Sequence, residues 1–404
     1  GAGVTCVWGR DDAGLVPGHD FVVWSPGLPV DHPLAVAARA AGLPVWSELE
    51  LGYRAARAPL VCITGTNGKS TTTDLVGALL RAAGREVAVC GNIGRAICEV
   101  AESVSPAGLL VVEVSSFQLE TVDRLHPHIA TWLNLTPDHL DRHGSLAVYG
   151  EMKQRLFARQ TEEDWAILNA DDPEVSSRRA GGGAPAEFSV AHAVDEGAFH
   201  DDGEIVLARH GGREALLPRA EVRLPGPHNL ANVLAALATV LPLEPSAEVL
   251  RRVLREYAGL EHRLELAGEL HGVRFVNDSK ATNTDSLRVA LQSFAGPVVL
   301  IAGGRDKGQD FKPLAALVRR AVRHVVLIGE GAPAMAAAWP GVSQERAATL
   351  AEAVQRAYEA ARPEGATVLL SPGCASFDMF RDYEDRGRRF KEEVARLAVG
   401  GVTA

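Results

Sequence analysis

The chain has 404 residues, and its 41 lysines and arginines against 51 aspartates and glutamates give a formal net charge of −10 and a pI of about 5.8. Hydrophobic residues make up 47% and charged residues 23%, which is the balance of a globular protein and argues against extensive disorder. This acidic balance is unlike the basic footprint of a nucleic-acid-binding protein. No apolar run approaches the roughly 20 residues of a membrane helix, and the first residues do not resemble a signal peptide.

The cysteines are few, odd in number and scattered without a CxxC pair. A disulfide framework would need paired, regularly spaced cysteines, so we expect free thiols in a reducing compartment, and hence a cytoplasmic protein. The five are Cys6, Cys62, Cys90, Cys98 and Cys374.

Buried strands alternate with helices along the chain. Short aliphatic and β-branched runs predict strands at Val4–Trp8, Phe21–Trp24, Leu60–Thr64, Leu109–Val114, Ile129–Leu133, Val298–Ala302, Val325–Ile328 and Thr367–Leu370. Helical periodicity predicts helices at Ser70–Ala83, Ala147–Ala158, Leu314–Arg323, Thr349–Ala361 and Arg381–Leu397. This alternation is typical of α/β proteins whose parallel sheets are covered on both faces.

Two breaks in composition indicate domain boundaries. An Arg/Ala stretch at 53–59 precedes the strongest strand-and-loop signal, and a helical segment gives way to new strands near 257–264. We therefore expect three domains, at residues 1–57, 58–259 and 260–404. We expect the first to start at the second strand of a dinucleotide-like fold, and we expect the glycine-rich stretch Arg178–Ala186 to be a surface loop.

The strongest motif is the segment from Leu60 to Thr73, LVCITGTNGKSTTT, in which a strand runs into a glycine-containing loop and then a helix beginning near Lys69. Such a loop directs backbone N–H groups and a helix N-terminus at phosphate oxygens. The Lys69 ammonium can then reach the β- and γ-phosphates, and the Ser70 hydroxyl can hold Mg²⁺. The match to GxxxxGK[ST] is imperfect because Ile63 replaces the first glycine, and the alternative is a Gly/Asn turn that caps an ordinary helix.

Two further side chains follow strands of the same region. Glu113 ends the strand at 109–114, where a carboxylate faces the crevice at the carboxyl edge of a parallel sheet, so it is a candidate Mg²⁺ ligand. A structural cap or an ion pair is the alternative role for Glu113. His139 lies in a loop after the next strand and can ligate a metal through a neutral imidazole, although a solvated histidine is the alternative.

A series of motifs in fixed order resembles the Mur ligases of bacterial peptidoglycan synthesis over essentially the whole chain. The motifs are GTNGKST at 65–71, GNIG at 91–94, EVSSFQLE at 113–120, HNLAN at 228–232, GLEHR at 259–263, NDSKATN at 277–283 and SPGCAS at 371–376. The first is shared with folylpolyglutamate synthases, whereas the last two are typical of the D-glutamate-adding member. The start departs from the family pattern, because the opening strand, glycine-rich turn and helix of relatives are not found.

The resemblance implies an ATP-dependent amide ligase that adds D-glutamate to UDP-N-acetylmuramoyl-L-alanine through an acyl phosphate. It implies an N-terminal domain for the UDP moiety, a central ATPase-type domain with a mostly parallel sheet and a C-terminal dinucleotide-fold-like domain for the amino acid. Charge neutralisation of the phosphates by Lys69 and two Mg²⁺ ions would assist the transfer. Ser70 and Glu113 resemble ligands of the first ion and His139 a ligand of the second.

Further residues acquire roles only through the resemblance. Lys153 matches a carbamylated lysine of the family, whose carboxylate-like group supports Mg²⁺. The residue pattern alone would instead predict a solvated lysine on a helix. Residues matching the ATP site are Gly65, Thr66, Asn67, Gly68, Lys69, Ser70, Thr71, Thr72, Asn229, Asn232, Arg263, Asp278 and Lys280. Residues matching the UDP-substrate site are Ser25, Pro26, Gly27, Asn92, Ser115 and Gln118. Residues matching the D-glutamate site are Thr282, Lys307, Ser376, Phe377 and Tyr383.

Within these sets, Asn229 and Asn232 are expected to read the adenine because they lie one turn apart on a predicted helix, with helix capping as their alternative. Other readings of the whole chain remain: a neighbouring Mur ligase or folylpolyglutamate synthase-like ligase, and a P-loop ATPase without ligase activity. The expected partners are small molecules, without nucleic acid or membrane, and a monomer is expected.

Overall fold

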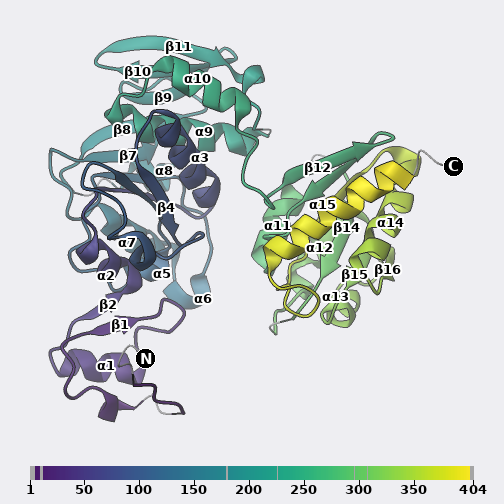
Figure 1. Cartoon of the computed structure of the whole chain (residues 1–404), viewed down its shortest axis with the longest axis horizontal. Coiled ribbons are helices and arrows are strands. Elements are labelled where there is room, and N and C mark those ends of the chain that lie inside the picture. Colours follow the sequence, from purple (N-terminus) through teal and green to yellow (C-terminus); the bar gives the residue numbers. More distant parts are fainter. Residues whose placement is uncertain are drawn as a thin grey trace. The chain divides into compact units, whose positions relative to one another are not determined.

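In a computed structural model, the described residues are 5–9, 12–178, 181–224, 226–294, 296–306 and 308–400. They form two compact units, Gly1–Ala258 and Gly259–Ala404 (Figure 1). Both are α/β units, and their main sheets are largely parallel, as the alternating sequence pattern predicts. Within the described residues, no helix is both long and apolar enough to cross a membrane.

The first unit contains a small and a large sheet. In the small sheet β1 (Val22–Trp24) pairs in parallel with β2 (Val45–Ser47). The large sheet has the order β11-β10-β9-β8-β7-β6-β3-β5-β4 and is parallel except for β10 and β11. Its strands are β3 (Leu60–Thr64), β4 (Val87–Gly91), β5 (Leu109–Glu113), β6 (Ile129–Trp132), β7 (Trp165–Asn169), β8 (Ala184–Ser189), β9 (Gly197–Asp201), β10 (Glu204–Arg209) and β11 (Gly212–Pro218).

The helices of this unit connect the strands. They are α1 (Pro33–Ala40), α2 (Glu48–Ala55), α3 (Lys69–Ala82), α4 (Ile97–Val100), α5 (Ser116–Leu119), α6 (Leu140–His143), α7 (Leu146–Gln154), α8 (Pro173–Ser176), α9 (Pro227–Val240) and α10 (Ala247–Glu256). Short 3₁₀ turns lie at Ala13–Leu15, Arg155–Phe157, Arg219–Glu221 and Leu241–Leu243.

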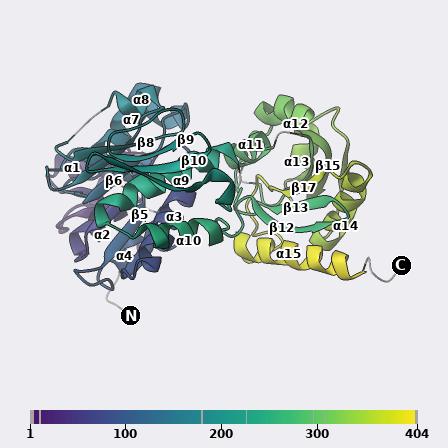
Figure 2. The ribbon, with the colours of Figure 1, turned by 90° about the horizontal axis from the view of Figure 1, so that it is seen from above.

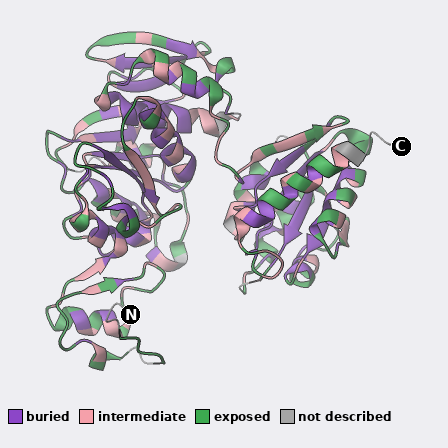
Figure 3. Cartoon of the chain, viewed as in Figure 1, coloured by how far each residue is buried: buried purple, intermediate pink, exposed green. Residues whose placement is uncertain are grey.

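The large sheet is buried on both faces, which explains its continuous apolar runs. Alternate residues of a strand point to opposite faces. In β3, Val61 and Ile63 pack with α3 and α9, whereas Leu60 and Cys62 pack with α2, α4 and α7. Figure 3 shows these strands as a buried layer between helices whose outer faces are exposed. The parallel strands therefore end together at one edge, from which the loops that follow them emerge.

The second unit repeats this plan in a six-stranded sheet of order β12-β13-β17-β14-β15-β16, parallel except for β12. Its strands are β12 (Glu265–Leu270), β13 (Val273–Asn277), β14 (Val298–Gly303), β15 (Val322–Ile328), β16 (Gln344–Arg346) and β17 (Thr367–Leu370). Its helices are α11 (Thr284–Gln292), α12 (Ala315–Ala321), α13 (Ala332–Ala338), α14 (Leu350–Ala361) and α15 (Tyr383–Gly400), with 3₁₀ turns at Lys312–Leu314 and Arg362–Glu364. Figure 2 shows α11, α12 and α13 over one face and α14 and α15 over the other, matching two separate apolar clusters.

Two local predictions are wrong. Residues 5–8 of the strand expected at Val4–Trp8 are irregular, and Val4 lies outside the described residues. Trp8 is 87% exposed, and within the described residues no strand pairs with this apolar run to bury it. The loop expected at Arg178–Ala186 ends early, because Ala184 already pairs with β7 as the first residue of β8. The five cysteines are free thiols, as predicted.

A buried carboxylate joins α2 to the turn that precedes β6. Glu50 is fully buried, and its oxygens accept hydrogen bonds from the backbone N–H groups of Asp123, Arg124 and Leu125 at 2.9–3.1 Å. The Nε of Arg54 donates to the same carboxylate at 2.7 Å. A buried charge is stable only with such partners, so Glu50 fastens the N-terminal helices to the large sheet.

We expect Glu50→Gln to destabilise the first unit, because an amide presents its own NH₂ group to backbone donors. A buried group left unsatisfied costs about 1–3 kcal/mol, and each kcal/mol lowers the melting temperature of a domain of this size by roughly 2–4 °C. Thermal unfolding followed by circular dichroism measures the change. Glu99→Gln, which alters only an exposed ion pair with Arg95, is the control, and equal melting temperatures for the two variants would contradict the role of Glu50.

Candidate functional site

The glycine loop between β3 and α3 is held in shape by an asparagine distant in sequence. The backbone N–H groups of Thr66 and Asn67 donate to Oδ1 of Asn134 at 3.0 and 2.8 Å, and Nδ2 of Asn134 donates to the carbonyl of Asn67 at 3.1 Å. Asn134 follows β6, the parallel neighbour of β3. The loop is therefore fixed before any ligand arrives. α3 begins at Lys69 as predicted, its N-cap is Gly68 without a side-chain cap, and a helix N-terminus of this kind favours an anion.

A second asparagine approaches the same loop from α9. Gly68 has a φ of +84°, and a Cβ atom there would lie 2.2 Å from Oδ1 of Asn232. Only glycine allows this close approach with this backbone conformation. Nδ2 of Asn232 donates to Oδ1 of Asn229 at 3.0 Å, so the two amides share a helix face beside the loop. The N-cap of α9 is Gly226 rather than either asparagine, so capping that helix is not their role.

Two lysines converge on one carbonyl of the loop. Nζ of Lys69 donates to the carbonyls of Gly65 and Thr66 at 2.9 and 2.8 Å, and Nζ of Lys153 donates to that of Gly65 at 2.8 Å. Burial, together with the neighbouring Lys69 ammonium, holds the pKa of Lys153 well below its usual value. The sequence alone reads Lys153 as solvated, whereas it is buried at the loop.

Glu113 ends β5 directly beside the strand that leads into the loop. It pairs in register with Ile63 and is only 2% exposed. Its Oε1 accepts a hydrogen bond from Nδ2 of Asn92 at 2.8 Å, whereas Oε2 is buried and has no hydrogen-bond partner among the described residues. Carboxylate and hydroxyl oxygens are the ligands that Mg²⁺ prefers. Glu113 and Ser70, which is in the first turn of α3, therefore fit a hard cation.

His139 lies on an aromatic patch beside Lys153. Its backbone has a φ of +52°, which is uncommon for a non-glycine residue. Its ring packs against Phe117 with centroids 4.8 Å apart and lies 6.3 Å from Tyr149, whose ring also lies 4.5 Å from Nζ of Lys153. The structure thus brings His139 and Lys153 onto the same tyrosine.

The turn at Ser25, Pro26 and Gly27 follows β1 and is tied to this region. Nη2 of Arg142 donates to the carbonyl of Leu28 at 2.8 Å, and the Arg142 guanidinium lies over the Phe117 ring at 4.8 Å. The turn expected to contact the UDP moiety therefore adjoins the helix that begins after His139.

The other residues expected to contact the UDP-substrate follow β4 and β5. Asn92 is held by Glu113 as described above. Ser115 and Gln118 form a reciprocal capping box on α5, in which the Ser115 hydroxyl and backbone N–H both lie 3.0 Å from Oε1 of Gln118. Their side chains thus have a structural partner, and a role in substrate contact remains a prediction.

In the second unit, predicted site residues gather at the carboxyl edge of the parallel sheet, where ligands bind in open α/β sheets. Asp278, after β13, is buried and accepts hydrogen bonds from Oγ of Ser371 at 2.8 Å and from the backbone N–H of Leu264 at 3.3 Å. Burial raises the pKa of Asp278 to about 7. Arg263 and Lys280 flank it and are partly buried.

The residues expected to bind D-glutamate lie around the same edge. Ser376 is buried after β17, Phe377 beside it is 60% exposed, and Thr282 and Tyr383 are partly buried. Burial raises the pKa of Tyr383 above its usual value. Lys307 lies outside the described residues.

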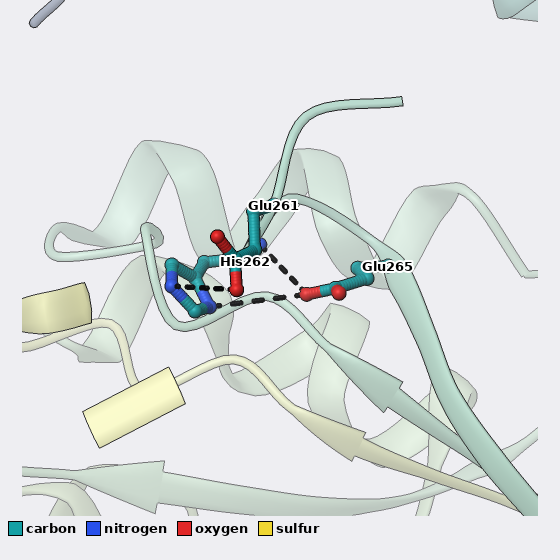
Figure 4. Close-up of side chains that lie close together, drawn as sticks. All are labelled: Glu261, His262 and Glu265. Carbon is teal, nitrogen blue, oxygen red and sulfur yellow. Dashed lines mark hydrogen bonds and ion pairs between the residues drawn. The ribbon is translucent and has the colours of Figure 1, made fainter. Parts of the chain in front are cut away.

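A group of possible cation ligands at the start of the second unit is ion-paired with a lysine. Figure 4 shows the His262 imidazole facing a carboxylate oxygen of Glu261 and one of Glu265, with Nδ1 of His262 3.8 Å from Oε2 of Glu265. Nζ of Lys391 binds both carboxylates, that of Glu265 at 3.0 Å. Nδ2 of Asn277 donates to Nδ1 of the imidazole, which leaves the proton on Nε2. This group therefore serves as an anchor for α15 and does not fit a metal.

Sequence reasoning missed Asn134 and Tyr149. Both had a usable signal: Asn134 directly follows a parallel strand at the carboxyl edge, and Tyr149 precedes Lys153 by one helical turn. Their contacts depend on pairing and packing that the pattern of residues leaves open.

Comparisons with known proteins agree with this arrangement. Residues 63–240 match the family model "Mur ligase middle domain" and residues 262–374 match "Mur ligase, glutamate ligase domain". A UDP-N-acetylmuramoylalanine–D-glutamate ligase of Pelobacter propionicus is 47% identical over 98% of this chain and 89% of its own length, and that of Geobacter metallireducens is 45% identical over 99% and 88%. The crystal structure of UDP-N-acetylmuramate-alanine ligase from Thermotoga maritima has the same fold, with a TM-score of 0.58 and 18% identity over 96% of this chain and 88% of that one.

The raised pKa of Asp278 predicts a specific pH dependence of stability. An aspartate ionises near pH 3.8 in the unfolded chain but near 7 in the folded one, so between these values the folded state binds more protons. Its contribution to stability is therefore fully present below about pH 4 and is lost as the pH rises to 7, with a slope of up to about 1.4 kcal/mol per pH unit. Asp278→Asn should flatten this slope in urea unfolding of the second unit, whereas the exposed control Asp310→Asn should not. An unchanged slope in Asp278→Asn would contradict the assignment.

Proposed function

This chain belongs to the Mur ligase family, and we propose that it joins D-glutamate to UDP-N-acetylmuramoyl-L-alanine with ATP in peptidoglycan precursor synthesis. The proposal rests on one observation above all: a pre-formed phosphate loop at a helix N-terminus, on whose Gly65 carbonyl two lysine ammoniums converge beside the buried carboxylate of Glu113. Relatives named for this reaction share 45–47% of the residues over nearly the whole chain.

The reaction follows from the chemistry of the substrates. An oxygen of the alanyl carboxylate attacks the γ-phosphorus of ATP, the bond to the β,γ-bridging oxygen breaks, and ADP leaves. The D-glutamate amine then attacks the carbonyl carbon of the acyl phosphate and loses a proton, and inorganic phosphate leaves from the tetrahedral intermediate. The free carboxylate would not condense with an amine in water, so ATP provides the leaving group.

Residues of the first unit are suited to the phosphoryl transfer. The N–H groups of the loop and α3, spanning Gly65 to Thr72, are proposed to cradle the phosphates, and the Lys69 ammonium to turn from the loop carbonyls to the β- and γ-phosphates. Asn229 and Asn232 are proposed to read the adenine. In the second unit, Arg263, Asp278 and Lys280 are proposed as ATP contacts.

Two Mg²⁺ ions are proposed to neutralise the phosphate charge when bound. Ser70 and Glu113 would hold the first, which agrees with the unpartnered oxygen of Glu113. His139 and Lys153 would hold the second. As an ammonium Lys153 would repel a cation, so we propose that its amine reacts with CO₂ to form a carbamate and release a proton, a reaction that a lowered pKa favours because it needs the neutral amine.

The remaining assignments complete the proposal. Ser25, Pro26, Gly27, Asn92, Ser115 and Gln118 are proposed to contact the UDP-substrate. Thr282, Lys307, Ser376, Phe377 and Tyr383 are proposed to bind D-glutamate. We further propose three domains, at 1–57, 58–259 and 260–404, and a monomer that acts in the cytoplasm, in keeping with its five free thiols.

Phosphate release under defined substrate combinations tests the function. We expect release of phosphate only when UDP-N-acetylmuramoyl-L-alanine, D-glutamate and ATP are all present, with ¹⁸O from the alanyl carboxylate found in the phosphate. Lys69→Ala should reduce turnover by about 10²-fold or more, since a charge at the transferred phosphoryl group contributes that much. Hydrolysis without the acceptor substrates would indicate an ATPase, and activity with another amino acid would indicate a different ligase.

The carbamate proposal is tested by chemical rescue. Lys153→Ala should lose most of its activity and regain part of it with added acetate or formate, because a short carboxylate can occupy the space of the carbamate. Mass spectrometry after trapping with a methylating reagent should find the modified lysine in the wild-type chain. Lys312→Ala, on a 3₁₀ turn in the second unit, should retain activity without rescue. Unmodified wild-type protein with full activity would overturn the carbamate.

A further inference from the structure

Three loops of the second unit meet at the carboxyl edge of its sheet. They follow β13, β14 and β17, which are neighbours in the order β13-β17-β14. The loop after β13 carries Asp278, Lys280 and Thr282, and the loop after β17 carries Ser376 and Phe377. Binding of one amino acid by both loops requires that they keep a fixed separation.

We propose that Arg386, on α15, is the positioning residue that sets this separation for D-glutamate. This inference rests on the proposed function, since it concerns the amino-acid site of that reaction. Nε of Arg386 donates to Oγ of Ser279 at 2.9 Å, and Nη2 donates to the carbonyl of Ser279 at 2.8 Å. Nη1 donates to the carbonyl of Cys374 at 3.1 Å. One guanidinium thus joins the two loops: Nε and Nη2 contact the loop after β13, and Nη1 contacts the loop after β17.

The contacts are well defined because the side chain is entirely enclosed. Arg386 has 0% exposure, and its three nitrogens all have acceptors in the two loops. Burial lowers the pKa of Arg386 to about 10, so it stays protonated at neutral pH. Full desolvation of a cation is costly unless the cation is hydrogen-bonded. If position 386 only had to fill space, an apolar side chain would make the fold more stable, so the hydrogen bonds of Arg386 point to a positioning role.

The third loop and α15 itself are joined to the same cluster. A Cβ atom at Gly304, after β14, would lie 3.2 Å from Nη1 of Arg386, and the backbone N–H of Arg305 donates to the carbonyl of Ala375 at 2.8 Å. Oγ of Ser279 donates in turn to the carbonyl of Tyr383 at 2.8 Å. A shift of Arg386 would therefore move Ser279, Cys374 and Tyr383 together.

The geometry requires an arginine. A guanidinium is a planar fork with five N–H donors in fixed directions, whereas a lysine ammonium is a single point charge on a flexible stem. Lysine at position 386 would keep the charge, but it would not span Ser279 and Cys374 with the same fixed spacing. The conservative variant therefore separates positioning from charge.

The test is the steady-state kinetics of Arg386→Lys in the full chain, with each substrate varied in turn. We expect the KM for D-glutamate to rise about tenfold or more and the KM for UDP-N-acetylmuramoyl-L-alanine to stay within about twofold, since small misplacements of binding groups have large effects. Arg388, an exposed arginine two residues along α15, lies 3.9 Å from Asp382. Arg388→Met is the control and should behave as the wild type.

Other outcomes are decisive too. An unchanged KM for D-glutamate in a folded Arg386→Lys variant overturns the inference, as does a loss of kcat without any change in KM, which indicates a purely structural role. If Arg386→Lys does not fold, Ser279→Ala removes the hydroxyl that accepts from Arg386 and donates to the Tyr383 carbonyl, and it leaves the Ser279 carbonyl in place for Nη2. A raised KM for D-glutamate then supports the inference and an unchanged one overturns it. A wild-type chain that releases no phosphate with D-glutamate would instead contradict the proposed function.

Discussion

The first unit is organised around a shared acceptor: the Gly65 carbonyl receives both the Lys69 and the Lys153 ammonium. Two like charges at one oxygen repel each other, and burial of Lys153 makes this arrangement more costly still. Under the proposed function, the repulsion would be relieved when anionic phosphate draws Lys69 away or when Lys153 loses its charge. The loop, the proposed cation ligands Ser70 and Glu113 and the aromatic patch at His139 all lie near this pair of lysines.

Both units use polar side chains from distant segments to position the loops at the carboxyl edge of their sheets. In each unit, buried parallel strands end at one edge of the sheet. The loops that follow these strands contact side chains from other segments of the same unit. In the first, Asn134 forms hydrogen bonds to the phosphate loop, and the Asn232 amide lies beside Gly68. In the second, Arg386 holds the loops after β13 and β17. The rigid sheets determine where the loops begin, and these few polar side chains determine the shape and spacing of the loops.

Much of this could be predicted from the sequence. The buried runs, such as Leu60–Thr64, and the phosphate loop have strong local signals, because continuous apolar strands and glycine turns have few alternatives. The strand predicted at Val4–Trp8 is wrong, because an apolar run forms a buried strand only where a partner strand pairs with it. The capping box of Ser115 and Gln118 has a local S-x-x-Q signature. Burial of Lys153 and the contacts of Asn134 and Arg386 arise only when distant segments pack, so no local pattern encodes them.

The location of Asn134 and Asn232 beside the phosphate loop has a consequence for biosynthesis. The loop at 65–71 is made early, but the side chains that shape it come about 65 and 165 residues later in the order of translation. A nascent chain on the ribosome therefore lacks the hydrogen bonds between Asn134 and this loop until the segment after β6 has been made. It lacks the Asn232 amide beside Gly68 until α9 has been made.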